Sequence, residues 1–187
     1  MPDDAHYFIG IDVPDEYKEF LSKWQESLEP FVDYRKWVNM DDFHVTFRFL
    51  GGLANQELAQ LKNKLTNLVG KPFQVEVKGI DFFGKEDQPR VMYAEVERNE
   101  AIFDLKQSVD DLLLDLGIEP EKRPYRPHIT LAKKWRKGKL QIPKDVLERK
   151  ILEQHHEFDF HISSIQLFQV HPDRVKKYEV IDTFSLE

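Results

Sequence analysis

The sequence predicts an α+β fold in which helices lie outside mainly antiparallel sheets, and three observations predict it. Strand and helix patterns follow one another in the order strand, helix, strand, helix, strand, strand, helix and then further strands. The succession of His, aliphatic residue, Thr and apolar strand occurs twice, at His44 and at His128. Each half of the chain therefore holds one such strand and a long amphipathic helix, and we expect residues 1–187 to form a single domain.

The first half of the chain contains two predicted strands and two predicted helices. Residues 7–13 form an apolar run that predicts a buried strand ending at Pro14. Apolar residues then recur at helical spacing: Tyr17, Leu21, Trp24 and Leu28. Residues 43–50 predict a second strand, closed by a pair of glycines. The next helical pattern consists of Leu58, Leu61, Leu65 and Leu68, and Gly70 can end that helix.

The second half of the chain is richer in strand patterns. Five segments rich in β-branched and aromatic residues predict strands: 73–83, 91–97, 125–132, 161–170 and 178–186. Between the second and third of these strands, apolar residues from Ile102 to Leu116 predict a helix that Gly117 stops. A short helix is predicted over 146–154, and the basic run 135–145 is predicted to be a loop.

The charge of the chain is unevenly placed. Its net charge of −7 argues against a protein that coats long nucleic acids. Nine Lys or Arg residues and no Asp or Glu nevertheless lie between Lys122 and Lys144, and His128 lies within this strip. A basic strip in an acidic protein indicates a small anionic ligand or the end of a nucleic acid, and a solvated basic loop is the alternative.

The sequence contains no Cys, and we expect neither a membrane span nor a signal peptide. No apolar run approaches the length of a membrane span, and residues 1–13 do not resemble a signal peptide. The lack of Cys excludes disulfides, thiolate catalysis and Cys-ligated metals. We therefore expect a cytoplasmic protein that is not associated with membranes.

The two histidine motifs carry matching sets of side chains. Alternate residues of a strand share a face, so His44, Thr46 and Arg48 are expected to project together. The same parity in the second motif groups three residues: Arg126, His128 and Thr130. Each strand thus presents an imidazole, a hydroxyl and a guanidinium, which are suited to holding a phosphate and moving a proton near neutral pH.

Two such faces meeting across a cleft can hold one histidine neutral as general base and the other protonated as general acid. This pairing cleaves a phosphodiester without a metal. For either histidine alone, a structural role is the more common interpretation. The coincidence of parity, Arg and Thr on both strands favours the catalytic interpretation.

Other histidines fit catalysis less well. His161 is followed by Ser163 on its face but has no Arg there, which favours a structural role. The C-terminal histidines lack the spacing of a metal-binding helix, so no metal site is predicted. Two alternatives remain open: a metal-dependent hydrolase that uses these histidines, and a non-catalytic module that binds RNA ends or nucleotides. Three aromatic residues can stack a base but are more often part of a core: Phe8, Trp37 and Trp135.

Taken in order, these segments resemble the two-histidine (2H) phosphoesterase superfamily, and specifically its bacterial RNA 2′,3′-cyclic phosphodiesterase branch, also called 2′-5′ RNA ligase. The similarity extends over nearly the whole chain. It rests on "YFIGIDVP", "KWVNMDDFHVTFRFLGG", "YRPHITLAKKW" and the final "ISSIQLFQVHP…YEVIDTFSL". One departure is His171-Pro172, where many relatives have a small hydroxyl residue, and it bears on the base-binding rim.

The resemblance implies two pseudo-symmetric lobes with a central cleft between the motif histidines. It implies that His44 donates a proton to the leaving ribose oxygen and that His128 accepts one from the attacking water. Thr46 and Thr130 would hold phosphate oxygens, and Arg126 would support them. The implied reaction is metal-independent hydrolysis of a 2′,3′-cyclic phosphate to a 2′-phosphate, with possible reversal to 2′-5′ ligation. The implied partners are RNA ends or cyclic nucleotides, no cofactor is implied, and we expect a monomer.

Overall fold

The computed structural model describes residues 5–136, 138, 140 and 142–187. Within these residues nine strands form one sheet: β1 (His6–Asp12), β2 (Tyr34–Trp37), β3 (His44–Gly52), β4 (Phe73–Lys85), β5 (Gln88–Val96), β6 (His128–Trp135), β7 (Phe158–Ile162), β8 (Ser164–Val170) and β9 (Tyr178–Ser185). Their order is β7-β4-β5-β6-β3-β1-β8-β9, with β2 also paired to β6, and the pairs are antiparallel. The predicted α+β class is confirmed.

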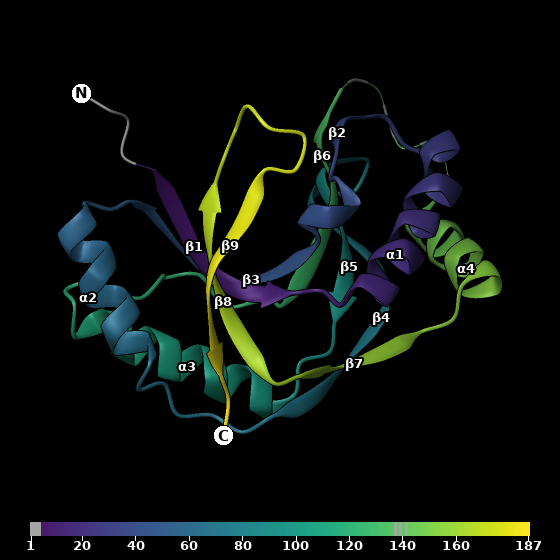
Figure 1. The fold of residues 1–187 in the computed structure, drawn as a ribbon. Coiled ribbons are helices and arrows are strands. Elements are labelled where there is room, and N and C mark those ends of the chain that lie inside the picture. The colour runs from purple at the N-terminus through teal and green to yellow at the C-terminus, as the bar shows by residue number, and fades with distance from the viewer. Residues whose placement is uncertain (1–4, 137, 139, 141) are drawn as a thin grey trace.

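The helices divide between the two halves of this sheet. The described residues contain four α-helices and two short 3-10 helices: α1 (Asp15–Leu28), η1 (Glu29–Phe31), η2 (Met40–Asp42), α2 (Asn55–Leu65), α3 (Glu100–Leu114) and α4 (Lys144–Gln154). Figure 1 shows α2 and α3 beside the half that contains β1, β8 and β9, and α1 and α4 beside the half that contains β4 and β7. No helix of the described residues has the length and apolar character needed to cross a membrane.

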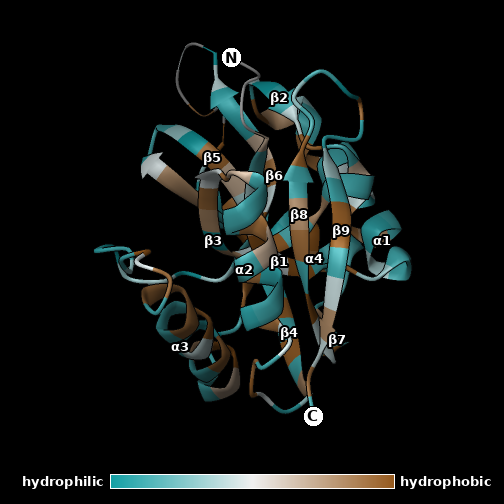
Figure 2. Ribbon diagram, turned by 60° about the vertical axis from the view of Figure 1, so that its left-hand side comes forward, coloured by the Kyte–Doolittle hydropathy of each residue, from teal (hydrophilic) through white to brown (hydrophobic). Residues whose placement is uncertain are grey.

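Amphipathic sequence accounts for the way the helices pack. Helix α1 buries Leu21, Trp24 and Leu28, which its helical periodicity places on one side. Helix α3 begins at Asn99, whose side chain accepts a hydrogen bond from the backbone amide of Ile102 at 3.0 Å. In Figure 2 the strands carry much of the hydrophobic colour, whereas α1 is largely hydrophilic on its visible side. The apolar faces of helices and sheet therefore form the core between them.

The two halves of the sheet meet at the two motif strands. Strands β3 and β6 are central in the order, and their pairing is recorded at Val45 and Ile129. Each of these residues directly follows a motif histidine. The fold thus brings the two histidine motifs together at the junction between the halves.

Several predicted boundaries were wrong. The predicted strand 161–170 is two strands separated at Ser163: β7 pairs with β4 at one edge, and β8 pairs with β1 in the other half. Strand β2 was not predicted. Strand β6 begins at His128 rather than at Tyr125, because Pro127 has no amide hydrogen to donate. Residues 137, 139 and 141 of the predicted loop lie outside the described residues.

Candidate active site

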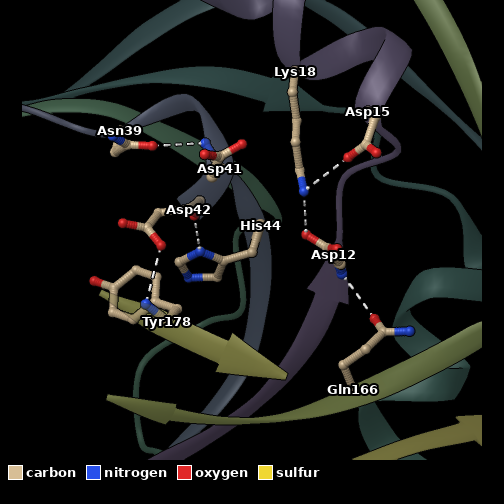
Figure 3. A network of polar contacts seen from close by, with 9 residues as sticks. All are labelled: Asp12, Asp15, Lys18, Asn39, Asp41, Asp42, His44, Gln166 and Tyr178. Atoms are coloured by element: carbon tan, nitrogen blue, oxygen red, sulfur yellow. Dashed lines mark hydrogen bonds and ion pairs between the residues drawn. The ribbon is translucent and has the colours of Figure 1, made fainter. Parts of the chain in front are cut away.

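His44 stands at the start of β3 with both ring nitrogens engaged. Its Nδ1 lies 2.7 Å from the carbonyl oxygen of Asp42, and its Nε2 lies 2.8 Å from Oγ1 of Thr46. Because a carbonyl oxygen only accepts hydrogen bonds, Nδ1 carries the hydrogen and Nε2 of the neutral ring has a free lone pair. The Thr46 hydroxyl then donates to Nε2. Figure 3 shows the ring turned toward the Asp42 carbonyl.

His128 repeats this arrangement on β6. Its Nδ1 lies 2.6 Å from the carbonyl oxygen of Arg126, which is again the residue two positions earlier. The same reasoning assigns the hydrogen to Nδ1 and leaves Nε2 available. Two independent strands therefore present an imidazole in the same tautomer.

The strand register places the histidine of each motif directly opposite the threonine of the other. Val45 of β3 pairs with Ile129 of β6. Continuing this antiparallel register by one residue in each direction sets His44 opposite Thr130, and Thr46 opposite His128. Directly opposed residues have Cβ atoms about 4.5–5.5 Å apart. Both imidazoles and both hydroxyls thus border one small space between the strands.

The expectation that Arg48 shares this face was wrong. In the pairing of β1 with β3, Ile9 is opposite Arg48 and Gly10 is opposite Thr46, so that Phe47 is an extra, bulged residue. A bulge reverses the alternation of side chains beyond it. Arg48 is consequently only 8% exposed. It donates to the carbonyl of Glu119, and its guanidinium lies 3.9 Å from a carboxylate oxygen of Asp110 in α3.

The same bulge brings Phe49 to the face of Thr46. Phe49 is 60% exposed, and its ring lies 5.6 Å from that of Phe8. Strand parity alone assigned Phe49 to the opposite face, and no residue type in the sequence marks the bulge. Sequence reasoning therefore missed this side chain.

A matching bulge occurs in β6. Met92 of β5 is opposite Ala132 and Tyr93 is opposite Thr130, so that Leu131 is the extra residue. The bulged residue again stands three positions after the histidine. Lys133, the counterpart of Phe49 in the second motif, is thereby placed on the face of Thr130. It is close enough to His44 for its charge to lower the pKa of that imidazole.

Glycine at position 10 permits the close approach of β1 to the first motif. A Cβ atom at Gly10 would lie 2.4 Å from the carbonyl oxygen of Val45, well inside contact distance. A side chain at this position would push β1 and β3 apart directly behind Thr46. Close backbone approach of this kind explains a glycine within a strand.

Aromatic rings surround His44. Ring centroids of Phe8, Tyr178 and Phe168 lie 4.7, 5.0 and 5.8 Å from that of His44. Burial lowers the pKa of His44 to about 4, and the charges of His128 and Lys133 act in the same direction. The hydrogen bond to the Asp42 carbonyl acts in the opposite direction. At neutral pH the imidazole of the free protein is therefore neutral.

Fewer aromatic rings pack against His128 than against His44. Phe83 and Tyr93 lie 5.0 and 5.1 Å from its ring, measured between centroids. Burial lowers the pKa of His128 below its usual value, and the hydrogen bond to the Arg126 carbonyl opposes this effect. Both motif histidines are thus neutral bases until a negative charge enters the site.

Asp42 connects His44 to the C-terminal hairpin. Its side chain is buried, and its two carboxylate oxygens accept hydrogen bonds from the backbone amides of Lys177 (2.8 Å) and Tyr178 (3.0 Å). Its carbonyl orients His44, and Tyr178 packs its ring edge-on against the imidazole. Figure 3 shows Asp42 beside both His44 and Tyr178. Nothing in the sequence distinguished Asp42 from its acidic neighbour Asp41, so this role could not be predicted.

A groove of about 500 Å³ opens beside Thr46 and His128. Its wall includes the rings of Phe49 and Phe83 and three guanidinium groups: Arg90, Arg123 and Arg126. Within the described residues none of these three arginines forms an ion pair with a carboxylate. The groove can therefore receive a flat ring together with an anion.

The remaining histidines lie elsewhere. His161 is exposed on β7, at the opposite edge of its half from β6 and β3. His155 contacts Ser27 at 3.0 Å, and His171 contacts Glu179 at 2.7 Å. In the part of the chain that the structure describes, no group of three or more His, Asp or Glu is arranged to hold a metal ion.

The aromatic residues considered for base stacking are core residues. Phe8 is fully buried beneath His44. Trp37 and Trp135 are partly buried and pack against the core, where both contact Tyr34. Phe49, rather than any of these three, is the aromatic side chain exposed beside the motif residues.

Comparisons with known proteins identify the family and agree with the fold. The family model of the AKAP7 2′5′ RNA ligase-like domain matches residues 6–186. The chain is 32% identical over 189 residues to the RNA 2′,3′-cyclic phosphodiesterase of Bacillus subtilis (strain 168), covering 100% of both proteins. In fold it resembles Escherichia coli LigT complexed with 3′-AMP (TM-score 0.77, 18% identity, 97% of this chain and 98% of LigT). It also resembles TT0787 of Thermus thermophilus (TM-score 0.75, 23% identity, 96% of this chain and 97% of the other).

Proposed function

The chain belongs to the 2H phosphoesterase superfamily, within the group of AKAP7 2′5′ RNA ligase-like domains, and we propose that it hydrolyses 2′,3′-cyclic phosphates at RNA ends or on nucleotides to 2′-phosphates. One observation carries the proposal. Two imidazoles whose Nε2 atoms can accept a proton, and two threonine hydroxyls, border the same space on paired strands. Such a pair supplies both proton transfers that the reaction needs.

The proposed reaction opens the cyclic diester in one in-line displacement. Nε2 of His128 takes a proton from water, whose oxygen bonds to phosphorus. The bond from phosphorus to O3′ breaks, and Nε2 of His44 gives its proton to O3′. The product is a 2′-phosphate with a free 3′-hydroxyl, and the two histidines exchange their protonation states through solvent. Acid and base are both side chains, so this scheme is metal-independent.

The phosphate itself prepares His44 for the acid role. In the free protein burial lowers the pKa of His44 to about 4. A bound phosphate anion favours the imidazolium and raises this pKa. Thr46, Thr130 and the unpaired guanidinium of Arg126 then stabilise the charge that develops on the phosphate oxygens.

The groove beside the motifs binds the nucleoside of the substrate. The exposed ring of Phe49 lies on the same face as Thr46, and Phe83 stands across the groove beside His128. A base stacked on such an aromatic platform gains roughly 1–3 kcal/mol with little dependence on its identity. Reversal of the reaction would join a 5′-hydroxyl end through a 2′-5′ linkage, although water at bulk concentration makes hydrolysis dominant.

Product identification tests the proposal. The chain is incubated with an oligoribonucleotide that ends in a 2′,3′-cyclic phosphate, in the presence of EDTA, and phosphorus NMR of a cleaved cyclic mononucleotide distinguishes the two monoesters. We expect turnover to the 2′-phosphate. A predominant 3′-phosphate would place the acid beside O2′ and overturn the assignment of His44. Binding without turnover would instead favour the non-catalytic RNA-end or nucleotide-binding module.

A further inference from the structure

Two lysines stand directly opposite each other next to the histidine pair. Lys36 of β2 and Lys133 of β6 are cross-strand partners in an antiparallel pair. Like charges in this position repel each other and destabilise the sheet. Burial is the largest cause that lowers the pKa of Lys133. The charges of Lys36, Lys134 and Lys177, the last of which directly precedes β9, lower this pKa further.

No acidic side chain neutralises this group in the described part of the chain. Lys62, Lys64, Lys78 and Lys144 each form an ion pair, whereas none of the ion pairs includes Lys36 or Lys133. The ammonium of Lys177 donates to the carbonyl of Pro172 rather than to a carboxylate. Several lysines thus converge without a counter-ion in a protein of net charge −7.

An acidic residue beside Lys133, Asp42, is already engaged in other hydrogen bonds. Asp42 raises the pKa of Lys133 through its charge, but both of its carboxylate oxygens accept backbone amides of the hairpin. Asp42 therefore offsets part of the repulsion without binding a lysine. The ammonium groups keep their capacity to bind an external anion.

The backbone beside Lys133 is strained. Lys134 has φ 65° and is the one non-glycine residue with positive φ among those described. Non-glycine residues in this region cost about 1 kcal/mol or more, and such strain tends to occur at functional sites. Here it turns the chain immediately after Lys133.

The lysine group lies on the opposite side of the histidine pair from the aromatic groove. Arg126 and His128, at and just before the start of β6, line the groove. Lys133 lies toward the other end of β6, three residues beyond Thr130. Because Leu131 is a bulged residue, Thr130 and Lys133 stand opposite Tyr93 and Val91, which are two residues apart in β5. At roughly 3.3 Å per strand residue the Cα separation of Thr130 and Lys133 is therefore about 7 Å. The distance suits a second phosphate of an extended strand whose terminal phosphate is held between the histidines.

We propose that Lys36, Lys133 and Lys177 form a second phosphate subsite, which binds the phosphodiester on the 5′ side of the terminal nucleotide. This inference rests on the proposed function and specifies its substrate: an RNA strand rather than a free cyclic nucleotide. An ammonium group binds a phosphate as a point charge, without regard to the base attached. The subsite therefore selects for chain length and not for sequence.

The test compares two substrates that differ by one phosphate. They are adenosine 2′,3′-cyclic phosphate and the same nucleotide with an added 5′-phosphate. We expect the wild-type kcat/KM to be about tenfold higher for the 5′-phosphorylated substrate, as one charge-assisted contact provides. Lys36→Gln and Lys177→Gln should each remove most of this preference while changing the rate on the unphosphorylated substrate less than twofold.

A matched control is Lys71→Gln, since Lys71 is exposed, unpaired within the described residues and outside the motif strands. It should leave both rates unchanged. With a dinucleotide that ends in a cyclic phosphate, Lys36→Gln and Lys177→Gln should each also reduce the slope of log kcat/KM against log salt concentration by about 0.7. Lys133 is not used as a test variant because it also affects His44.

The outcomes separate this inference from the proposed function. Equal wild-type rates on the two nucleotides, or equal losses on both in Lys36→Gln, would overturn the second subsite while leaving hydrolysis intact. No turnover of either nucleotide would overturn the proposed function instead. In that case calorimetry with adenosine 2′-phosphate, with and without a 5′-phosphate, still decides the subsite through the same comparison of Lys36→Gln with the wild type.

Discussion

The surroundings of His44 and His128 differ although their backbone frames are the same. Each ring donates through Nδ1 to the carbonyl of the residue two positions earlier, and each strand bulges three residues after the histidine. His44 is enclosed by three aromatic rings and bonded to Thr46. His128 has two aromatic neighbours and borders the open groove.

This difference teaches that a repeated motif acquires two roles from its environment. The motif sets the tautomer and the direction of Nε2 on both strands. Burial and nearby positive charge then make His44 the harder of the two to protonate in the free protein, with a pKa of about 4. In the proposed reaction, His44 consequently depends on the substrate anion for its acidic proton, whereas His128 is prepared as a base without substrate.

The largest expected effect comes from removing either imidazole. His44→Ala and His128→Ala should each lower single-turnover rates by at least about 10²-fold, because each removes one proton transfer. The double variant should be little slower than either single variant, since acid and base act in one transition state. Rates are measured by rapid quench on variants whose fold is checked by circular dichroism.

His161→Ala is the control for this pair, because His161 lies in an exposed position on β7. It should remain within a few-fold of the wild type. A folded but inactive His161→Ala, or a fully active His128→Ala, would show that the wrong histidines have been paired.

A smaller effect is expected from replacing Asp42, which contacts His44 but not His128. Asp42→Ala removes the acceptor of two backbone amides and loosens Tyr178 from the imidazole. Hydrogen bonds to a charged group are worth roughly 1.5–3 kcal/mol, so we expect about a tenfold or larger loss of kcat and lower stability. Asp42→Asn, which keeps one acceptor oxygen, should recover part of the rate.

The exposed neighbour Asp41 provides the matched control, and Asp41→Ala should be nearly silent. Stability is followed by urea unfolding beside the kinetics. If Asp42→Ala loses stability but retains the wild-type kcat, the carboxylate serves the fold alone and does not position His44.

A displacement of the pH profile should distinguish the free enzyme from the complex. The profile of kcat/KM reports the free enzyme, in which the pKa values of both histidines are lowered. A bound phosphate raises them, so the bell-shaped profile of kcat should lie at higher pH than that of kcat/KM. Both limbs belong to the coupled pair. Coincident profiles would contradict the substrate-induced protonation of His44.

The smallest effect at neutral pH concerns stability. The folded pKa of His44 is about 4, below its unfolded value of about 6.5, so the unfolded chain binds more protons between these values. The contribution of His44 to stability is therefore complete above about pH 6.5 and is lost as pH falls toward 4, by up to about 3 kcal/mol. His44→Gln should flatten this dependence in urea unfolding at pH 7 and pH 4.5. An unchanged dependence would mean that other groups cause it.

Much of the fold was predictable because it depends on local patterns. Leu21, Trp24 and Leu28 repeat at helical spacing and are buried in α1. Strand β2 was missed because its four residues are mostly polar and gain their place by pairing with β6. The division of residues 161–170 between β7 and β8 was also missed, since the two strands pair with partners far apart in the sequence.

The sequence by itself determined the motif residues His44, Thr46, His128 and Thr130, because each histidine and its threonine are two positions apart on one strand and need no long-range contact to share a face. Only the tertiary structure decided what surrounds them. The bulges at Phe47 and Leu131 arise from pairing with neighbouring strands, and they turn Arg48 into the protein and bring Phe49 and Lys133 to the site. The different proton affinities of the two histidines likewise depend on burial and on charges from distant segments, which strand periodicity does not encode.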